Sequence, residues 1–120
     1  MSMRIYPKAK LWFVNEDGES VLGDGLVTLL EEVEKYRSIS KASKKLDMSY
    51  RYALHRVSLA ERRLRCVLIR RSRGGVAGGT SELTAQGKKL LIKYRNTERE
   101  IKKFLRSFSF AYRNKIQRYR

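Results

Sequence analysis

Residues 49–64 carry two different stripes of side chains at helical spacing, and this pattern restricts the fold more than any other part of the sequence. The apolar stripe consists of Ala53, Val57, Ala60 and Leu64. The opposite, polar and basic stripe consists of Arg51, His55, Ser58 and Arg62. Such a segment predicts an amphipathic helix that begins after the natural N-cap Ser49 and packs its apolar side on its own domain. The other side is left for solvent or for an acidic partner.

Two further helices are predicted before this one. Asp24 occupies the position of an N-cap, and apolar residues at helical spacing follow it as far as Arg37. A second, short helix begins after Ser38 or Ser40, and Asp47-Met48 is the break that ends it. The chain therefore contains three helices in close succession, with a short turn between the second and the third.

Two hairpins frame these helices. Residues 8–14 are β-prone, residues 15–18 form a turn cluster, and residues 20–22 return as a second strand. Trp12 and Phe13 are expected on the inner face of this hairpin, with a stacking surface for bases as the open alternative.

The second hairpin follows Arg65. The short apolar run 66–69 predicts a strand that returns at residues 81–83. Between these strands lies a basic segment with four glycines in six residues, which predicts a loop because so many glycines would destabilise a helix.

A last helix is predicted after Thr84, which is a suitable N-cap. Apolar residues then recur at alternating spacings of three and four, interrupted by Glu98: Leu91, Tyr94, Ile101, Leu105, Phe108 and Tyr112. This heptad-like seam is compatible with a partner helix or with an intramolecular core. We expect a single domain over residues 1–112, with the helix over 84–112, followed by a basic tail over 113–120.

The charge of the chain favours an acidic partner. The sequence of 120 residues has 28 Lys and Arg against 12 Asp and Glu, a net charge of +16. Residues 41–73 hold eleven basic and two acidic side chains, and residues 102–120 hold seven basic and no acidic ones. Like charges gathered in this way repel one another unless an anion relieves them, and double-stranded DNA is the leading candidate.

Other classes of function lack the residues they need. A single Cys and a single His predict neither a disulfide framework nor a metal site, so Cys66 is interpreted as a small core residue. The glycine-rich loop has no Gly-Lys-Ser/Thr, and no base is paired with a nucleophile, so we expect no enzyme, no cofactor and no catalytic residue. The start of the chain does not resemble a signal peptide and no apolar run could span a membrane, which predicts a cytoplasmic, nucleoid-associated protein.

Three helices followed by a strand, a glycine-rich basic loop and a return strand are the layout of a winged helix-turn-helix. The fold class predicted is therefore mainly α with small β-hairpins, a winged helix-turn-helix with a long C-terminal dimerisation helix. Segments 38–53, 71–79 and 83–87 also resemble the N-terminal DNA-binding domain of the molybdate-responsive, ModE-type regulators, which is related to the LysR-type helix-turn-helix. The resemblance covers roughly residues 8–108. It implies a homodimer, formed largely through the last helix, that places two third helices in successive major grooves.

The stripe and the resemblance together indicate which residues contact DNA. The expected DNA-binding residues are Ser40, Lys41, Ser49, Tyr50, Arg51, Tyr52, His55, Arg62, Arg70, Arg71, Arg73, Gly74 and Gly75. The expected dimerisation residues are Leu91, Tyr94, Ile101, Leu105 and Phe108.

The chain departs from the family pattern at several points, two of which bear on the turn after the third helix and on ligand sensing. Arg65 stands where LysR-type sequences usually have a helix-ending glycine. We expect no molybdate-binding domain and no small-molecule effector. The leading hypothesis is a sequence-specific homodimeric regulator. The alternatives are a low-specificity, nucleoid-type architectural protein and, third, a protein-interaction module.

Overall fold

The computed structural model describes residues 2–72 and 79–113, and it divides the chain into two compact units. The helix-turn-helix unit comprises Leu11–Arg95, and the terminal unit comprises Met1–Lys10 with Asn96–Arg120. The helix α4 (Ala85–Arg106) begins in the first unit and ends in the second.

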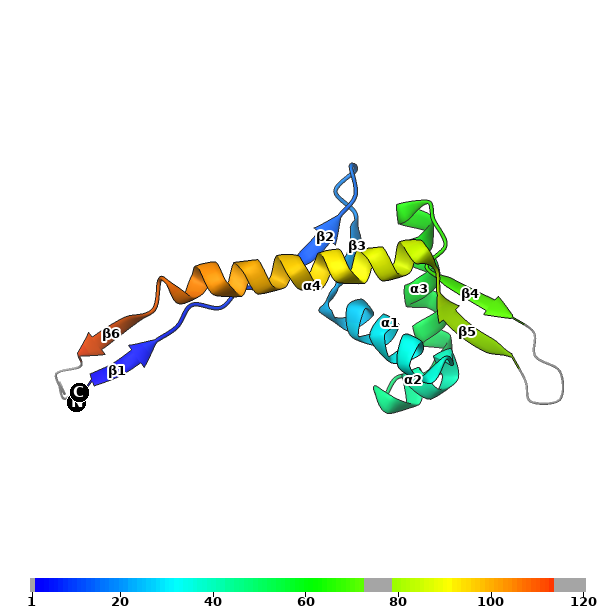
Figure 1. Ribbon diagram of the computed structural model, residues 1–120, viewed down its shortest axis with the longest axis horizontal. Coiled ribbons are helices and arrows are strands. Elements are labelled where there is room, and N and C mark those ends of the chain that lie inside the picture. Colours follow the sequence, from blue (N-terminus) through cyan, green and yellow to red (C-terminus); the bar gives the residue numbers. More distant parts are fainter. Residues whose placement is uncertain (1, 73–78, 114–120) are drawn as a thin grey trace, which may run out of the picture. The chain divides into compact units, whose positions relative to one another are not determined.

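The helix-turn-helix unit has the predicted order of elements (Figure 1). Its helices are α1 (Asp24–Tyr36), α2 (Ile39–Lys45), α3 (Tyr50–Leu64) and the first half of α4. Its strands are β2 (Trp12–Val14), β3 (Ser20–Gly23), β4 (Ile69–Ser72) and β5 (Thr80–Leu83). The antiparallel pair β2–β3 precedes the helices and the antiparallel pair β4–β5 forms the wing. The predicted winged helix-turn-helix with a long C-terminal helix is thereby confirmed.

Side chains from every helix of this unit share one apolar core. The fully buried residues include Leu22, Leu29, Leu30, Val33, Ala42, Ala53, Leu68 and Tyr94. Arg95 ties α4 to α1 as well, because its guanidinium donates to both carboxylate oxygens of Glu31, at 3.0 and 2.6 Å. Half-buried bidentate pairs of this kind fix geometry more firmly than exposed single contacts do.

Serine caps position α2 and α3 as predicted. The Ser38 hydroxyl accepts a hydrogen bond from the backbone N–H of Lys41, and the Ser49 hydroxyl accepts one from that of Tyr52, each at 3.0 Å. The prediction that Asp24 caps α1 is wrong. Gly23 is the N-cap and makes no side-chain cap, and Asp24 is the first helical residue, where its negative charge still favours the helix N-terminus.

The start of α4 is held against the wing by a short hydrogen-bonded network. The Thr84 hydroxyl accepts from the Gly87 N–H at 3.0 Å and donates to the Val67 carbonyl at 2.6 Å. The predicted cap of the last helix is therefore confirmed, and the same hydroxyl also links α4 to the segment before β4.

Two details of the hairpins differ from the prediction. Successive residues of a strand point to opposite faces, so only Phe13 of the pair Trp12 and Phe13 packs inward, while Trp12 stays 59% exposed. The first wing strand begins at Ile69, not at residue 66. Just before and at this start, the Glu61 carboxylate accepts hydrogen bonds from the backbone N–H groups of Leu68 and Ile69, at 2.8 and 3.2 Å.

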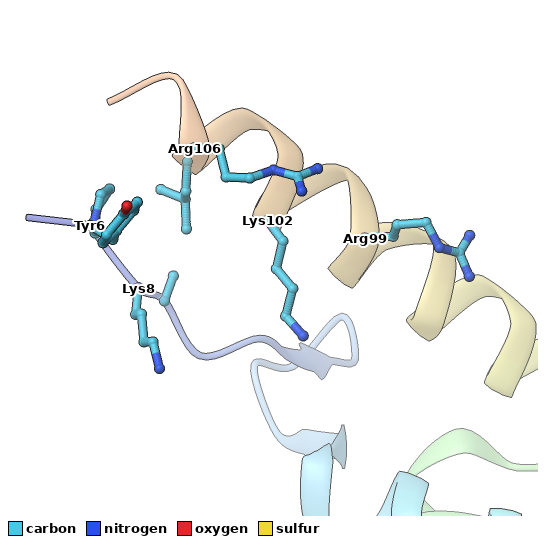
Figure 2. A pocket seen from close by; sticks show the side chains of 8 residues that line it. Tyr6, Lys8, Arg99, Lys102 and Arg106 are labelled. Carbon is cyan, nitrogen blue, oxygen red and sulfur yellow. The ribbon is translucent and has the colours of Figure 1, made fainter. Parts of the chain in front are cut away.

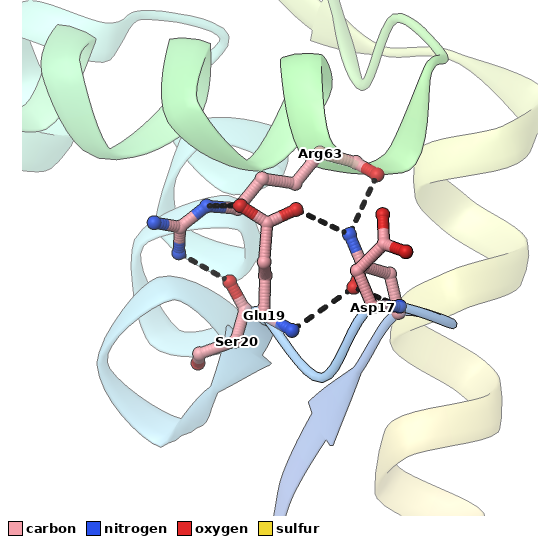
Figure 3. Close-up of polar contacts among 5 residues, drawn as sticks. Asp17, Glu19, Ser20 and Arg63 are labelled. Atoms are coloured by element: carbon pink, nitrogen blue, oxygen red, sulfur yellow. Dashed lines mark hydrogen bonds and ion pairs between the residues drawn. The ribbon is translucent and has the colours of Figure 1, made fainter.

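The turn of the β2–β3 hairpin is attached to the end of α3 (Figure 3). Asn15 accepts from the backbone N–H groups of Asp17 and Glu19, and its amide donates to the carbonyl of Arg63 at 3.3 Å. Arg63 in turn donates to the carbonyl of Ser20 at 2.8 Å. These contacts join the predicted turn to the helix that carries the basic stripe.

The terminal unit contains a strand pair that the sequence did not predict. β1 (Ser2–Ile5) pairs antiparallel with β6 (Phe110–Arg113), and α4 ends at Arg106. The predicted helix over 84–112 is therefore wrong at its C-terminal end. Three successive N–H groups from Ser107 to Ser109 bond to carbonyls three residues back, which tightens and closes the helix. Residues 114–120 of the predicted basic tail lie outside the described residues.

We expect Arg65→Gly to raise the free energy of unfolding by about 1 kcal/mol, because a β-carbon is disfavoured in the left-handed region. Arg65 ends α3 with φ at +56°, so the helix keeps the conformation that glycine adopts most readily. Urea denaturation of both proteins measures the change. Arg62→Gly, inside the same helix, is the matched control and should lower stability by about 1 kcal/mol. A loss of stability on Arg65→Gly would contradict the backbone argument.

Candidate nucleic-acid interface

The predicted polar stripe of α3 lies on its exposed side. Arg51, His55, Ser58 and Arg62 are all exposed. The apolar residues Ala53, Val57 and Ala60 are buried in the core. His55 is thus not a core histidine, and α3 presents two cations, an imidazole and a hydroxyl along one side.

Aromatic side chains flank this stripe at the start of α3. Tyr50 and Tyr52 are 47% and 48% exposed, beside Arg51 and the cap Ser49. The half-buried Arg56 donates to the Tyr52 hydroxyl at 3.4 Å, and its guanidinium lies 5.9 Å from the centre of the Tyr52 ring. Arg56 therefore positions Tyr52. Arg56 is not among the residues expected from the sequence, although its spacing of four from Tyr52 indicates this contact.

A groove of about 650 Å³ joins the helix-turn-helix to the wing. It is lined by Ser38, Ile39, Ser40, Tyr50, Arg71, Ser72, Gly79, Thr80 and Ser81. Three of the expected DNA-binding residues, Ser40, Tyr50 and Arg71, come together here from α2, α3 and β4. The hydroxyls of Ser72 and Thr80, which are 2.7 Å apart, were missed because pairing across the wing is not visible in the sequence. Hydroxyls and a guanidinium without a lining carboxylate suit a phosphate.

The register of the wing separates its two described arginines. Arg71 pairs with Ser81 and lines the groove, whereas the preceding Arg70 pairs with Glu82 on the opposite face of the strand. Glu82 also accepts a hydrogen bond from Arg37 at 3.0 Å. Arg70 is therefore exposed in a mixed-charge setting. Lys41 is exposed on α2 outside the groove. The predicted sites Arg73, Gly74 and Gly75 lie outside the described residues.

Two of the expected dimerisation residues belong to the core of their own chain. Leu91 is 6% exposed and Tyr94 is 1% exposed. The Tyr94 hydroxyl donates to the Leu11 carbonyl at 2.9 Å, and its ring centre lies 5.3 Å from that of Phe13. Leu91 and Tyr94 are thus already covered by the β2 segment and the core of their own chain. Ile101 and Leu105 are half-buried in the terminal unit and Phe108 is 55% exposed.

The described residues contain no group of three or more His, Cys, Asp or Glu side chains placed to hold a metal ion. Within the same residues, none of the helices combines the length and the apolar character needed to cross a membrane. Cys66 is half-buried and packs against the core.

Comparison with known proteins connects this geometry to a family. Residues 25–88, from α1 to the first turn of α4, match the model of the bacterial regulatory helix-turn-helix protein, lysR family. The chain is 31% identical over 87 residues to the molybdenum transport protein ModE of Azotobacter vinelandii. It is 33% identical over 87 residues to the molybdenum-pterin-binding protein MopB of Rhodobacter capsulatus.

Each alignment covers 72% of this chain and 32% of the relative, so the chain spans about a third of the length of these proteins. The matched region contains α3, its exposed stripe and the wing. The chain belongs to the lysR family of bacterial regulatory helix-turn-helix proteins and carries the DNA-binding fold of the LysR and ModE type.

Proposed function

We propose that this protein is a homodimeric transcription regulator that binds double-stranded DNA at a specific sequence. In this proposal α3 enters the major groove and the wing contacts the adjacent backbone or minor groove. The observation that carries it is that α3 exposes a basic stripe from Arg51 onward, while the preceding residue Tyr50 lines the hydroxyl-rich groove between α2, α3 and the wing.

We assign recognition of the DNA base sequence to the first turns of α3. A helix in the major groove contacts base edges mainly through its N-terminal residues. Arg51 is exposed there and can donate two hydrogen bonds to a guanine, and His55 lies about one turn further along the same side. The flanking Ser49, Tyr50 and Tyr52 are placed to contact sugars, phosphates or thymine methyl groups.

Phosphate binding is assigned to the groove and to the outer cations. Arg71 and the hydroxyls of Ser40 and Tyr50 surround a space that the backbone of one strand can enter. Lys41 and Arg62 lie outside this groove and are exposed, so they extend the positive surface. Such contacts fix the register of the protein on the duplex but do not read its sequence.

The dimer is assigned to the second half of α4 and the turn that follows it. Phe104 and Phe108 are 64% and 55% exposed, and their rings meet edge-on with centres 5.0 Å apart. Exposed aromatic pairs are favourable in interfaces, and Ile101, three residues before Phe104, lies on the same side of the helix. A dimer would place two recognition helices on half-sites about one helical turn, or 10 base pairs, apart.

Two substitutions in α3 test the assignment of base and phosphate contacts. The DNA site is first obtained by sequencing fragments that the protein retains from sheared genomic DNA at about 150 mM salt. Arg51→Ala should then weaken binding to that site by about 1–3 kcal/mol and relax the preference at one base pair. Arg62→Ala removes the same side chain eleven residues along the same stripe and should weaken specific and non-specific binding equally.

The outcomes separate the competing functions. A palindromic motif with half-sites about 10 base pairs apart supports the homodimeric regulator. Even coverage of the genome with tight binding would contradict sequence reading and indicate an architectural protein. If Arg51→Ala and Arg62→Ala have the same effect on every sequence, α3 is not the recognition helix.

A further inference from the structure

The terminal unit contains a cavity that the proposed DNA surface does not use (Figure 2). Residues 6–9 run along the last two turns of α4 and enclose about 450 Å³ with them. Cavities that hold small molecules commonly have volumes of about 300–1,000 Å³. Apolar surface is provided by Pro7, Leu105 and the exposed ring of Tyr6.

Four cations line this cavity and no carboxylate does. They are Lys8, Arg99, Lys102 and Arg106. Arg99 donates to the neutral Asn96 amide oxygen at 2.9 Å, and Figure 2 shows its guanidinium directed away from residues 6–9. Among the described residues no acidic group forms an ion pair with Lys8, Lys102 or Arg106. The ammonium groups of Lys8 and Lys102 lie beside the apolar surface without a partner carboxylate among the described residues, and an anion that enters the cavity would relieve the repulsion between them.

Two of the cations that line the cavity come from different segments of the chain. Figure 2 shows that Lys8, from the N-terminal segment, and Lys102, from α4, extend in the same direction beside the cavity. Their ammonium groups therefore lie on the same side of the cavity, where both would attract an anionic group, while Tyr6 and Leu105 remain available to an apolar body.

We propose that this cavity binds a small molecule in which a planar apolar ring carries a phosphate group. The ring would pack on Tyr6, Pro7 and Leu105, and the phosphate would accept hydrogen bonds from Lys8 and Lys102. Charge-assisted bonds to phosphate are among the stronger polar contacts in proteins. The DNA backbone is a poorer occupant, since its convex and fully polar surface would leave the apolar wall unfilled. The inference does not depend on the proposed DNA site.

The test uses 1-naphthyl phosphate with the full chain, measured by calorimetry and by NMR shifts of Tyr6 and Leu105. We expect saturable binding of one molecule per chain. 1-Naphthol lacks the charge and inorganic phosphate lacks the ring, so each should bind at least about tenfold more weakly. Lys102→Gln should reduce the affinity about tenfold, and Lys8→Gln should do the same. Lys103→Gln is the matched control, because this neighbouring lysine is exposed but does not line the cavity.

Three results would overturn the proposal. Equal losses for Lys102→Gln and Lys103→Gln would show that only the overall positive charge attracts the probe. Inorganic phosphate binding as tightly as 1-naphthyl phosphate would show that the apolar wall is not used. If duplex DNA displaces the probe, and Lys102→Gln weakens DNA binding more than Lys103→Gln, the cavity belongs to the DNA surface. Circular dichroism of each variant verifies that the fold is retained.

Discussion

Gly87→Ala is expected to lower the free energy of unfolding by about 3 kcal/mol, at the upper end of the usual cost of overpacking. A β-carbon at this position would lie 2.6 Å from the carbonyl oxygen of Leu68. That oxygen cannot easily move away, because it accepts the backbone N–H of Thr84 at 2.9 Å and Leu68 is completely buried. The added methyl group must therefore separate the start of α4 from the wing.

The measurement is urea denaturation followed by circular dichroism, with Gly25→Ala as the matched control. Gly25 also lies in a first helical turn, but the nearest atom to its added β-carbon is the flexible end of Arg56, 4.0 Å away. Alanine there should leave stability unchanged or raise it by up to about 1 kcal/mol. Equal stability of the two variants would mean that α4 and the wing can separate at little cost.

Raising the salt concentration from 50 to 200 mM is expected to weaken DNA binding by about 40-fold for each bound chain. Three of the described and exposed cations are assigned to phosphates: Lys41, Arg62 and Arg71. Each phosphate neutralised contributes about −0.9 to the slope of log K against log salt, so three contacts give a slope of about −2.7. Fluorescence anisotropy of a labelled duplex over a salt series measures this slope, and a dimer would make it steeper.

Arg71→Ala and Arg70→Ala form a matched pair for the same series. Arg71 lines the groove with hydroxyls, so its loss should reduce the slope by about 0.9. Arg70 lies opposite Glu82 on the other face of the wing, so its loss should reduce the slope less. A shallow slope for the parent protein would contradict phosphate binding by these cations. Equal changes for the two variants would contradict the assignment of the groove to the DNA backbone.

Local sequence patterns were sufficient to predict those features of the fold whose physical cause lies in neighbouring residues. The caps Ser38, Ser49 and Thr84 were predictable because a hydroxyl before a helix reaches an N–H two or three residues ahead. The two sides of α3 were predictable because 3.6 residues per turn separate its apolar from its basic residues. The order of elements in the helix-turn-helix unit, and with it the winged helix-turn-helix, followed from these short-range signals.

Tertiary structure decided which surfaces cover one another. The spacing of Leu91 and Tyr94 fits a partner helix as well as a core, and only the folded chain shows Tyr94 buried against Phe13 and Leu11. The strand at 110–113 has apolar spacing that also fits a helix. Its ladder comes from residues 2–5, more than a hundred positions earlier in the chain.

The same distinction applies to the candidate sites. Arg51 and His55 could be assigned from the sequence because they share one side of one helix. The groove that joins Tyr50 to Arg71 required the wing to fold back beside α2. The cavity in the terminal unit required residues 6–9 to meet α4. Helical periodicity can be recognised from residues a few positions apart in the sequence. Contacts between distant segments depend on how the whole chain packs, and the spacing of residues does not determine this packing.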